Sequence, residues 1–314
     1  MELILHHYYG SNYAEKARLM LGLKGLAWGS VIIPDVMPKP DLLPLTGGYS
    51  KTPVLQIGSD VYCDTRRIGD ELEARYPTPT LFPHSGRGIA DVIAHWADNN
   101  LTLAGGRYLI GRSHERWPPE FHADRAAMWG VPIDLERMAR SAERYRQQLV
   151  AQLDWITAML ADGRHYLLGT DPGIADISAY HILWFLHTGG EKATDVLNEF
   201  SVVRAWMQRV GKIGHGKVKD LKAADALDIA RSSKPKSVPN VAPDNAEGLR
   251  YGDMVQVKAE VAGRDPTVGA LHTLTRQHVA VMHSNPRVGD MVVHLPRMGY
   301  VVSRAKSISA AAAA

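Results

Sequence analysis

The stretch from Ser50 to Leu72 combines residue types that suit the recognition of a charged ligand. In SKTPVLQIGSDVYCDTRRIGDEL, Pro53 heads an apolar strand, and Asp64 and Thr65 stand at the start of a helix. A proline there removes one ladder hydrogen bond, and a cis peptide that leaves the neighbouring backbone open to a ligand is one reason for it. A carboxylate and a hydroxyl at a helix N-terminus can receive a charged group. Together these features predict a site for a small peptide.

The first 76 residues supply the elements that must position this site. A strand, a helix and a second strand come first, followed by a proline- and glycine-rich loop, a hairpin and a helix. The predicted elements are a strand over 2–9, a helix over 13–24 that stops at Gly25, a strand over 31–33, a short helix at 41–43, strands over 52–57 and 61–63 around a turn at Gly58, and a helix from Asp64. The order is therefore β-α-β-α-β-β-α.

The pattern changes to helix beyond a proline-rich connection over 77–83. Apolar stripes at helical spacing predict helices over 88–103, 135–160, 171–186 and 199–211, with an irregular segment over 113–132. Asp176, three residues after Gly173, can bond back to the start of its helix, which is a folding role. The sequence therefore predicts an all-helical second domain.

A third pattern follows the proline-containing segment Ser232–Gly248. Alternating apolar residues predict four or five short strands, which suggest a small barrel of roughly 55 residues. The predicted organisation is a first domain over 1–80, a helical domain over 84–230, a linker over 231–248, a small β-rich domain over 249–306 and a tail over 307–314.

Composition favours a soluble protein of a reducing compartment, which we take as the cytoplasm. The 314 residues carry a net charge of +3, and the single cysteine, Cys63, precludes an intrachain disulfide and reads as a buried small side chain. The N-terminus has no signal-peptide pattern, and no stretch approaches a membrane span. Basic residues are concentrated in 231–314, where 11 Lys and Arg stand against 6 Asp and Glu. Four histidines there, His272, His278, His283 and His294, lack metal-ligand spacing and are read as structural or surface residues.

Residues 1–225 resemble the glutathione S-transferase family in four motifs of matching order and spacing. The motifs are GSNYAEKARLML over 10–21, Lys51-Thr52-Pro53-Val54-Leu55, Asp64-Thr65, and Gly173-Ile174-Ala175-Asp176. The resemblance implies an α+β multi-domain fold: a thioredoxin-like βαβ-ββα domain, then an all-α domain. The small β-barrel-like domain lies outside the common family pattern.

The resemblance also implies glutathione as co-substrate, with no metal. Asp64 would accept from the γ-glutamyl ammonium, and Thr65 would donate to its carboxylate. Plain helix capping is the alternative role for this pair. Val54, after a cis Pro53, would pair with the cysteinyl unit as an added strand. The other implied contacts are Thr52 beside Pro53, and Lys39 or Lys51 for the glycyl carboxylate.

Ser11 stands where the family has a catalytic serine or cysteine. Its hydroxyl, beside a helix N-terminus, would donate to the sulfur and favour the thiolate, which attacks an electrophilic carbon. Serine cannot form a mixed disulfide, which argues against thiol exchange. Tyr9 is the alternative donor, because other branches of the family use a phenol, and simple capping is the alternative role for Ser11. His6 and His7 are expected to be packed within their strand.

An apolar electrophile is expected between the two domains, and a detoxifying homodimer is implied by the family. The predicted walls of this second pocket are Tyr8, Asn12, Trp96, Asn99, Tyr108 and Trp117. The rival hypothesis is a non-catalytic binding or scaffolding protein of the same fold, since Asn12 replaces the proline of many relatives. Its basic β-rich tail would then recruit a protein or nucleic acid, although no clear aromatic-basic RNA motif is present.

Overall fold

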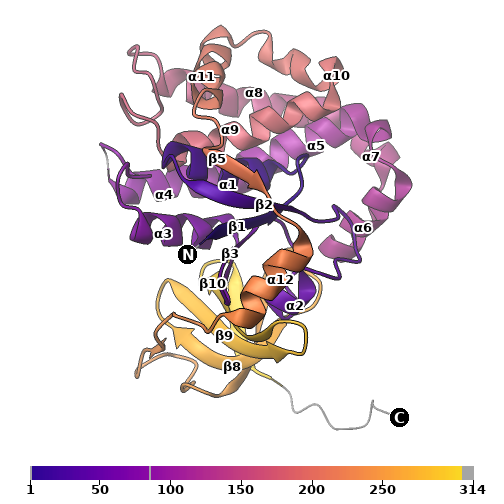
Figure 1. Cartoon of the computed structure of the whole chain (residues 1–314). Coiled ribbons are helices and arrows are strands. Elements are labelled where there is room, and N and C mark those ends of the chain that lie inside the picture. Colours follow the sequence, from indigo (N-terminus) through magenta and orange to yellow (C-terminus); the bar gives the residue numbers. More distant parts are fainter. Residues whose placement is uncertain (1, 85, 306–314) are drawn as a thin grey trace.

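The computed structural model describes residues 2–84 and 86–305 of the chain (Figure 1). The predicted tail over 307–314 lies outside the described residues. In Figure 1 the helical domain is at the top, the N-terminal strands lie below it, and the C-terminal strands lie at the bottom, farthest from the helical domain. None of the helices in the described part of the chain combines the length and apolar character that a membrane crossing needs.

The N-terminal domain has the thioredoxin-like order that the sequence predicted. Its elements are β1 (Leu3–His7), α1 (Asn12–Leu23), β2 (Ala27–Ile32), α2 (Leu43–Thr46), β3 (Val54–Ile57), β4 (Asp60–Cys63) and α3 (Thr65–Arg75). Strand β1 pairs in parallel with β2 and antiparallel with β3, which pairs antiparallel with β4. Gly25 ends α1 with φ of 62°, and Gly58 turns the hairpin with φ of 67°, conformations that glycine adopts without strain.

The second domain is helical, as predicted, with differences at three places. Its main helices are α4 (Arg87–Trp96), α5 (Thr102–Ser113), α6 (Pro119–Trp129), α7 (Leu135–Arg140), α8 (Ala142–Met159), α9 (Ile174–Leu186), α10 (Glu191–Thr194) and α11 (Ser201–Gly211). A π-helical turn, η1 (Ala97–Leu101), divides the predicted helix over 88–103, and Ser141 divides the one over 135–160. The segment over 113–132 is not irregular, because Pro119 occupies the first position of α6, where a proline costs no hydrogen bond.

Helix α9 lies at the centre of the helical domain, and Asp176 fixes its start. The carboxylate accepts from the Gly173 N–H at 3.1 Å, the Leu167 N–H at 2.8 Å and the Trp206 Nε1–H at 2.9 Å. The predicted folding role of Asp176 is therefore confirmed. Burial raises the pKa of this carboxyl, although the three donors favour its ionised form.

The C-terminal strands extend the N-terminal sheet instead of forming a separate barrel. They are β5 (Lys217–Asp220), β6 (Asn240–Val241), β7 (Met254–Ala259), β8 (Thr267–Leu274), β9 (His278–Asn285), β10 (Gly289–Pro296) and β11 (Tyr300–Arg304), with helix α12 (Ala223–Ser232) after β5. The sheet order is β11-β7-β8-β9-β10-β4-β3-β1-β2-β5, and it is not closed. The alternation of apolar residues predicted these strands, but it did not predict that they pair with the edge of the N-terminal sheet at β4.

Strands β10 and β5 join the later part of the chain to the two edges of the N-terminal sheet. Strand β10 pairs in parallel with β4, so that Val293 lies opposite Val61 and His294 opposite Tyr62. At the other edge, β5 falls within the predicted helical domain but pairs in parallel with β2. The chain after the helical domain therefore borders both edges of the thioredoxin-like sheet. We call residues 249–305 the sheet extension.

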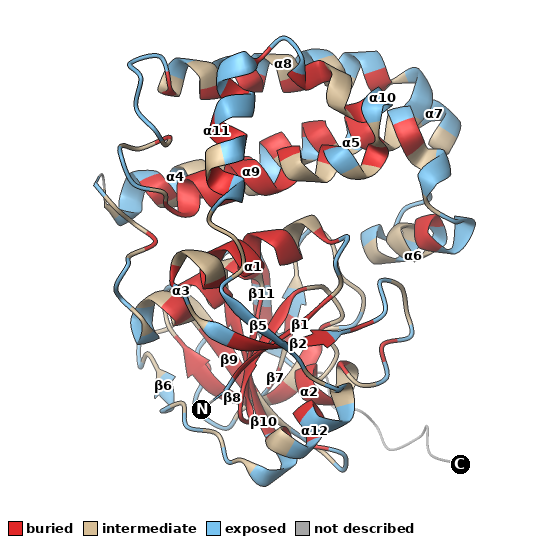
Figure 2. Cartoon of the chain, turned by 45° about the horizontal axis from the view of Figure 1, so that its top comes forward, coloured by how far each residue is buried: buried red, intermediate tan, exposed pale blue. Residues whose placement is uncertain are grey.

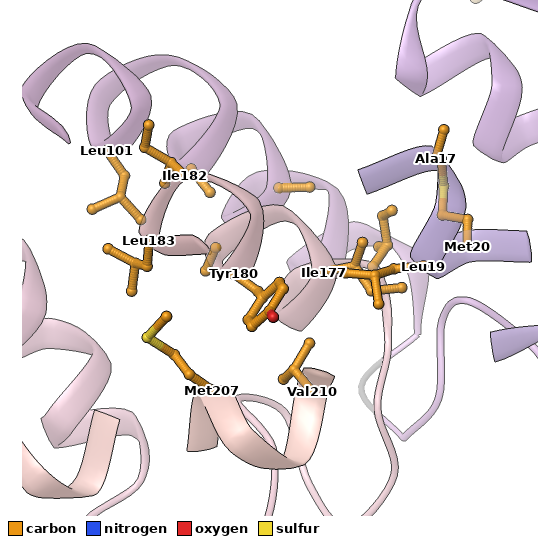
Figure 3. Packing of buried hydrophobic residues seen from close by; sticks show 14 of the residues in the cluster. Ala17, Leu19, Met20, Leu101, Ile177, Tyr180, Ile182, Leu183, Met207 and Val210 are labelled. Carbon is orange, nitrogen blue, oxygen red and sulfur yellow. The ribbon is translucent and has the colours of Figure 1, made fainter. Parts of the chain in front are cut away.

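Two hydrophobic cores lie on the two faces of the sheet (Figure 2). Figure 3 shows the first, in which Met20 of α1 lies on the side of Ile177 of α9, and Met207 of α11 packs within the helical domain near Leu183. The second core joins the N-terminal domain to the sheet extension. It includes Ile4, Val54, Val61 and Cys63 from one side and Val257, Leu295 and Val302 from the other. The sheet extension is thus part of a shared core, and Cys63 is a buried small side chain as predicted.

Asp60, the first residue of β4, fastens the sheet extension and the segment that leads to it. Its carboxylate accepts from the Lys236 N–H at 2.7 Å and the Ser237 hydroxyl at 2.5 Å, and lies 3.0 Å from His294 Nε2. Burial alone would raise the pKa of Asp60, but these hydrogen bonds outweigh it and lower the pKa. His294 in turn lies 3.0 Å from His278 Nε2 through its Nδ1. These histidines are structural, in agreement with the sequence analysis.

Candidate functional site

The site lies where three neighbouring strands reach the same end of the sheet. His6 of β1 and Cys63 of β4 are both register partners of Val54, the first residue of β3. Because β3 runs antiparallel to both neighbours, its start meets their ends. The turn after β1, the Thr52-Pro53 peptide and Asp64 therefore come together, and the Thr52-Pro53 peptide is cis, as predicted.

Lys39 braces the loop that leads to Pro53. Its ammonium donates to the Ser50 carbonyl at 2.9 Å and to the Thr52 Oγ1 at 3.1 Å, and its side chain is almost fully buried. Burial, followed by the nearby Arg125 guanidinium, lowers the pKa of Lys39 to about 8. Two of its three N–H donors serve the protein, so one remains for a ligand.

Asp64 and Thr65 form the N-terminus of α3. Asp64 has φ of 75°, a positive value unusual for a residue with a side chain, and its Oδ1 accepts from the Arg66 N–H at 2.9 Å. Its Oδ2 accepts from the Tyr300 hydroxyl at 3.1 Å. Burial raises the pKa of this carboxyl. Asp64 therefore caps the helix as predicted. Its Oδ2 is contacted by Tyr300, a residue that the sequence did not suggest for this site.

A shallow surface hollow lies between the loop before β3 and the sheet extension, and Tyr300, which contacts the Asp64 carboxylate, is part of its lining. It is lined by Tyr49, Ser50, Lys51, Val257, Arg264 and Tyr300, among others. The Lys51 ammonium lies 5.7 Å from the centre of the Tyr300 ring, and burial lowers its pKa. Lys51 is thus partly desolvated at the edge of the hollow, where it can meet an anionic group.

Ser11 ends the turn after β1 and caps α1. Its Oγ accepts from the Ala14 N–H at 3.1 Å, and the residue is only 4% exposed. That bond uses an oxygen lone pair and leaves the hydroxyl hydrogen to donate. Tyr9, the alternative donor, is 64% exposed. The hydroxyl of Tyr8 accepts from Arg125 at 3.1 Å.

Arg18 holds the turn that presents Ser11, and sequence reasoning did not assign it this role. Its guanidinium donates to the Tyr8 carbonyl at 3.4 Å, the Tyr9 carbonyl at 3.2 Å and the Glu15 carboxylate at 2.7 Å. Both charged side chains of this pair are about 95% buried. Glu15 and Arg18, two opposite charges three residues apart among the apolar residues of α1, were the signal in the sequence for a buried network.

A second buried network joins the two domains beneath the site. The Asn12 amide donates to His181 Nδ1 at 3.1 Å, and His181 Nε2 lies 3.1 Å from the Asp98 carboxylate. Asp98 also pairs with Lys16 at 2.6 Å. Burial would raise the pKa of Asp98, but Lys16 and His181 outweigh it and lower the pKa. Asn12, predicted as a wall of the second pocket, therefore also links α1 to α9.

The remaining predicted walls lie at different places. Trp117 packs near Phe121, whose ring lies 4.0 Å from the Arg125 guanidinium that contacts Tyr8, so Phe121 and Arg125 connect Trp117 to Tyr8. Trp96 packs against Trp155, and Asn99 is exposed and bonds to His95. Tyr108 is buried inside the helical domain, where its hydroxyl donates to Asp195. The structure does not bring these last three to the Ser11 turn.

Comparison with known proteins matches both domains to family models. Residues 5–80 match the glutathione S-transferase N-terminal domain, and residues 139–209 match the C-terminal domain. A search of curated proteins gave no match.

Solved structures extend the match over almost the whole chain. A GST-like protein from Pseudomonas syringae is 36% identical, with a TM-score of 0.77, and the alignment covers 96% of this chain and 100% of that one. A glutathione S-transferase from Methylobacterium radiotolerans, solved in complex with glutathione sulfonate, shares the fold at 20% identity and a TM-score of 0.51, over 70% of this chain and 98% of that one. One from Rhodospirillum rubrum is 21% identical, with a TM-score of 0.52 over 67% and 87% of the two chains. With the fold, the cis peptide at Pro53 and the two capped helix starts already in place, these matches show that the chain belongs to the glutathione S-transferase family.

Proposed function

We propose that this protein binds glutathione and conjugates its thiol to a small electrophile. The observation that carries the proposal is the convergence of Ser11, cis Pro53 and Asp64 at one end of the sheet. Two helices begin there, and each directs backbone N–H groups toward the same region, which favours anionic groups. The arrangement supplies a partner for each end of the tripeptide and a hydroxyl near its middle.

The proposed binding mode assigns one contact to each part of glutathione. Asp64 accepts from the γ-glutamyl ammonium, and Thr65 with the first N–H groups of α3 donates to the α-carboxylate. Val54 pairs with the cysteinyl backbone through its own N–H and C=O. The glycyl carboxylate lies toward the end of the site formed by Lys39, Lys51 and Thr52.

Ser11 is the proposed activator of the thiol. Its hydroxyl hydrogen is available to a sulfur, and its position at the start of α1 adds the positive end of the helix dipole. Tyr9 stays the alternative donor, because its exposed side chain could turn toward a bound ligand. The region of Tyr8 and Trp117, which Phe121 and Arg125 connect, is the proposed place for the electrophile.

We also propose that the protein is located in the reducing cytoplasm and forms a homodimer. Glutathione is kept as a thiol in that compartment, and the single buried cysteine suits it. Helix α4 exposes Ile89 at 55% and Val92 at 69%, an apolar face that a second copy of the chain could cover. Sedimentation equilibrium gives the oligomeric state, and a purely monomeric protein at micromolar concentration would contradict this part.

Replacing Asp64 with Asn should weaken glutathione binding about 10- to 100-fold, because a neutral amide cannot form the charge-assisted bond to the ammonium. Titration calorimetry on wild type and Asp64→Asn measures the loss. The exposed Asp228 provides a matched control, and Asp228→Asn should bind as the wild type does. Equal affinities for wild type and Asp64→Asn would contradict the assignment. If the wild type neither binds glutathione nor turns over an aryl halide, the enzyme proposal fails, and the hypothesis of a non-catalytic binding or scaffolding protein remains.

A further inference from the structure

The last strand of the sheet extension returns to the start of α3. Strand β11 lies at one end of the sheet, six places from β3 in the strand order, yet its first residue, Tyr300, reaches the carboxylate of Asp64. The open sheet therefore curls enough to bring the C-terminal part of the chain against the N-terminal domain. The shared hydrophobic core holds it there, because Tyr300 and Val302 belong to the same core as Tyr49 and Val54.

The Tyr300 hydroxyl makes a bond of defined direction. It donates to Asp64 Oδ2 at 3.1 Å, while the Arg66 N–H takes Oδ1 at 2.9 Å, so each carboxylate oxygen has a donor. The Tyr300 side chain is 93% buried and lies beneath the Lys51 ammonium. A carboxylate oxygen can accept more than one hydrogen bond, so this arrangement leaves acceptor capacity for a ligand ammonium.

Several other charged and titratable groups act on Asp64 from the elements around it. Lys51 and Lys16 favour its ionised form, and Asp98 opposes it. Tyr13, Tyr49 and Cys63 are the further titratable groups that interact with the Asp64 charge. Burial is the largest influence and raises the pKa of Asp64. The Tyr300 hydroxyl is a neutral donor to Asp64 Oδ2, so it stabilises the ionised carboxylate and offsets part of the desolvation. It carries no positive charge that would compete with a ligand ammonium for Asp64.

We propose that Tyr300 is a positioning residue of the γ-glutamyl site that acts through Asp64, because its hydroxyl bond favours the ionised form of that carboxylate. The sheet extension is then a working part of the ligand site. This inference rests on the proposed function for its ligand, but not for the state of Asp64 in the free protein.

Tyr300→Phe should change the pH dependence of glutathione binding. In Tyr300→Phe the ionised carboxylate loses a donor, so the pKa of Asp64 should rise. At a pH well above that pKa, Asp64 is ionised in both proteins, and the hydroxyl bond is present with and without ligand, so its contribution to affinity cancels. As the pH falls, the variant becomes protonated first and loses its affinity for the ammonium first.

Two measurements on the full-length protein test this. Titration calorimetry with glutathione across the acid range should show equal affinities at about pH 8 and an affinity of Tyr300→Phe about tenfold lower in the acid limb. Tyr251→Phe, which alters an exposed tyrosine of the same sheet extension, should follow the wild type throughout. The carboxyl ¹³C resonance of Asp64, assigned by its loss in Asp64→Asn, should titrate at a higher pH in Tyr300→Phe without any ligand.

The outcomes separate the two claims. Tighter binding by Tyr300→Phe at every pH would overturn the inference, because Tyr300 would then compete with the ammonium for Asp64. An unchanged titration of the Asp64 carboxyl would also overturn it. If neither the wild type nor the variants bind glutathione while the titration of the Asp64 resonance shifts as expected in Tyr300→Phe, the proposed function fails and the positioning role of Tyr300 stands.

Discussion

Acidification from about pH 7 to about pH 5 should lower the free energy of unfolding by several kcal/mol. Burial lowers the pKa of His6 to about 4, of His7 to about 3 and of His278 to about 2. In the unfolded chain each imidazole takes up a proton near pH 6.5. The folded state therefore binds fewer protons below that pH, and the unfolded state gains relative stability as the pH falls.

The magnitude follows from linkage. A histidine that protonates at about pH 6.5 when unfolded and stays neutral when folded costs about 2 kcal/mol of stability at pH 5. Three such residues would remove about 6 kcal/mol, which is comparable to the whole stability of many domains. Asp64 and Asp176 oppose this trend at lower pH, because burial raises their pKa values and protonation then favours the folded state.

Urea unfolding at a series of pH values measures this effect. His278→Gln should flatten the dependence on pH between about 7 and 5 by up to one proton, since it removes one of the titrating groups. The exposed His187 offers the matched control, and His187→Gln should retain the wild-type slope. A free energy of unfolding that is the same at both pH values would contradict the neutral, buried state of these histidines.

Turnover should fall about 100-fold or more in Ser11→Ala when glutathione is conjugated to an aryl halide. The hydroxyl would donate one hydrogen bond to the developing thiolate, and removal of one such donor costs roughly 100- to 1000-fold in comparable sites. Substrate affinity should change little, because the proposed contacts that hold the tripeptide lie at Val54, Asp64 and Thr65. Steady-state kinetics on wild type and variant give both quantities.

Two further variants make this result specific. Ser11→Ala also removes the cap of α1, which costs about 1 kcal/mol of stability. Asp134→Ala removes the cap of α7, where the Asp134 carboxylate accepts from Arg137 N–H, and should keep full turnover despite a similar loss. If Ser11→Ala keeps its activity and Tyr9→Phe loses it, the phenol is the activating group.

Local sequence signals were enough to predict the N-terminal domain. The turn at Gly58, the cap at Asp64 and the cap at Ser11 each depend on residues within a few positions of one another. Helix α6 was missed because the pair Pro118-Pro119 suggests an irregular segment, although the second proline is well placed to start a helix. Short-range chemistry therefore predicted most of the elements, together with the turn at Gly58 and the helix caps at Asp64 and Ser11.

Contacts between distant segments were beyond reach of the sequence pattern. Alternation gives the faces of a strand but not its partner, so nothing indicated that β10 would pair with β4 across more than 200 residues. The contact between Tyr300 and Asp64 also joins residues more than 200 positions apart and was equally hidden. The link from Asn12 through His181 to Asp98 likewise needs the packing of the two domains.

The state of the glutathione sulfur tests the central claim most directly. Ultraviolet difference titration of glutathione bound to the full-length protein follows formation of the thiolate. The account predicts that the bound thiol ionises at a lower pH than a free thiol, whose pKa is about 8.5, and that Ser11→Ala returns it toward that value. A bound thiol that ionises as it does in free solution, in wild type and variant alike, would contradict the proposal that this site activates glutathione.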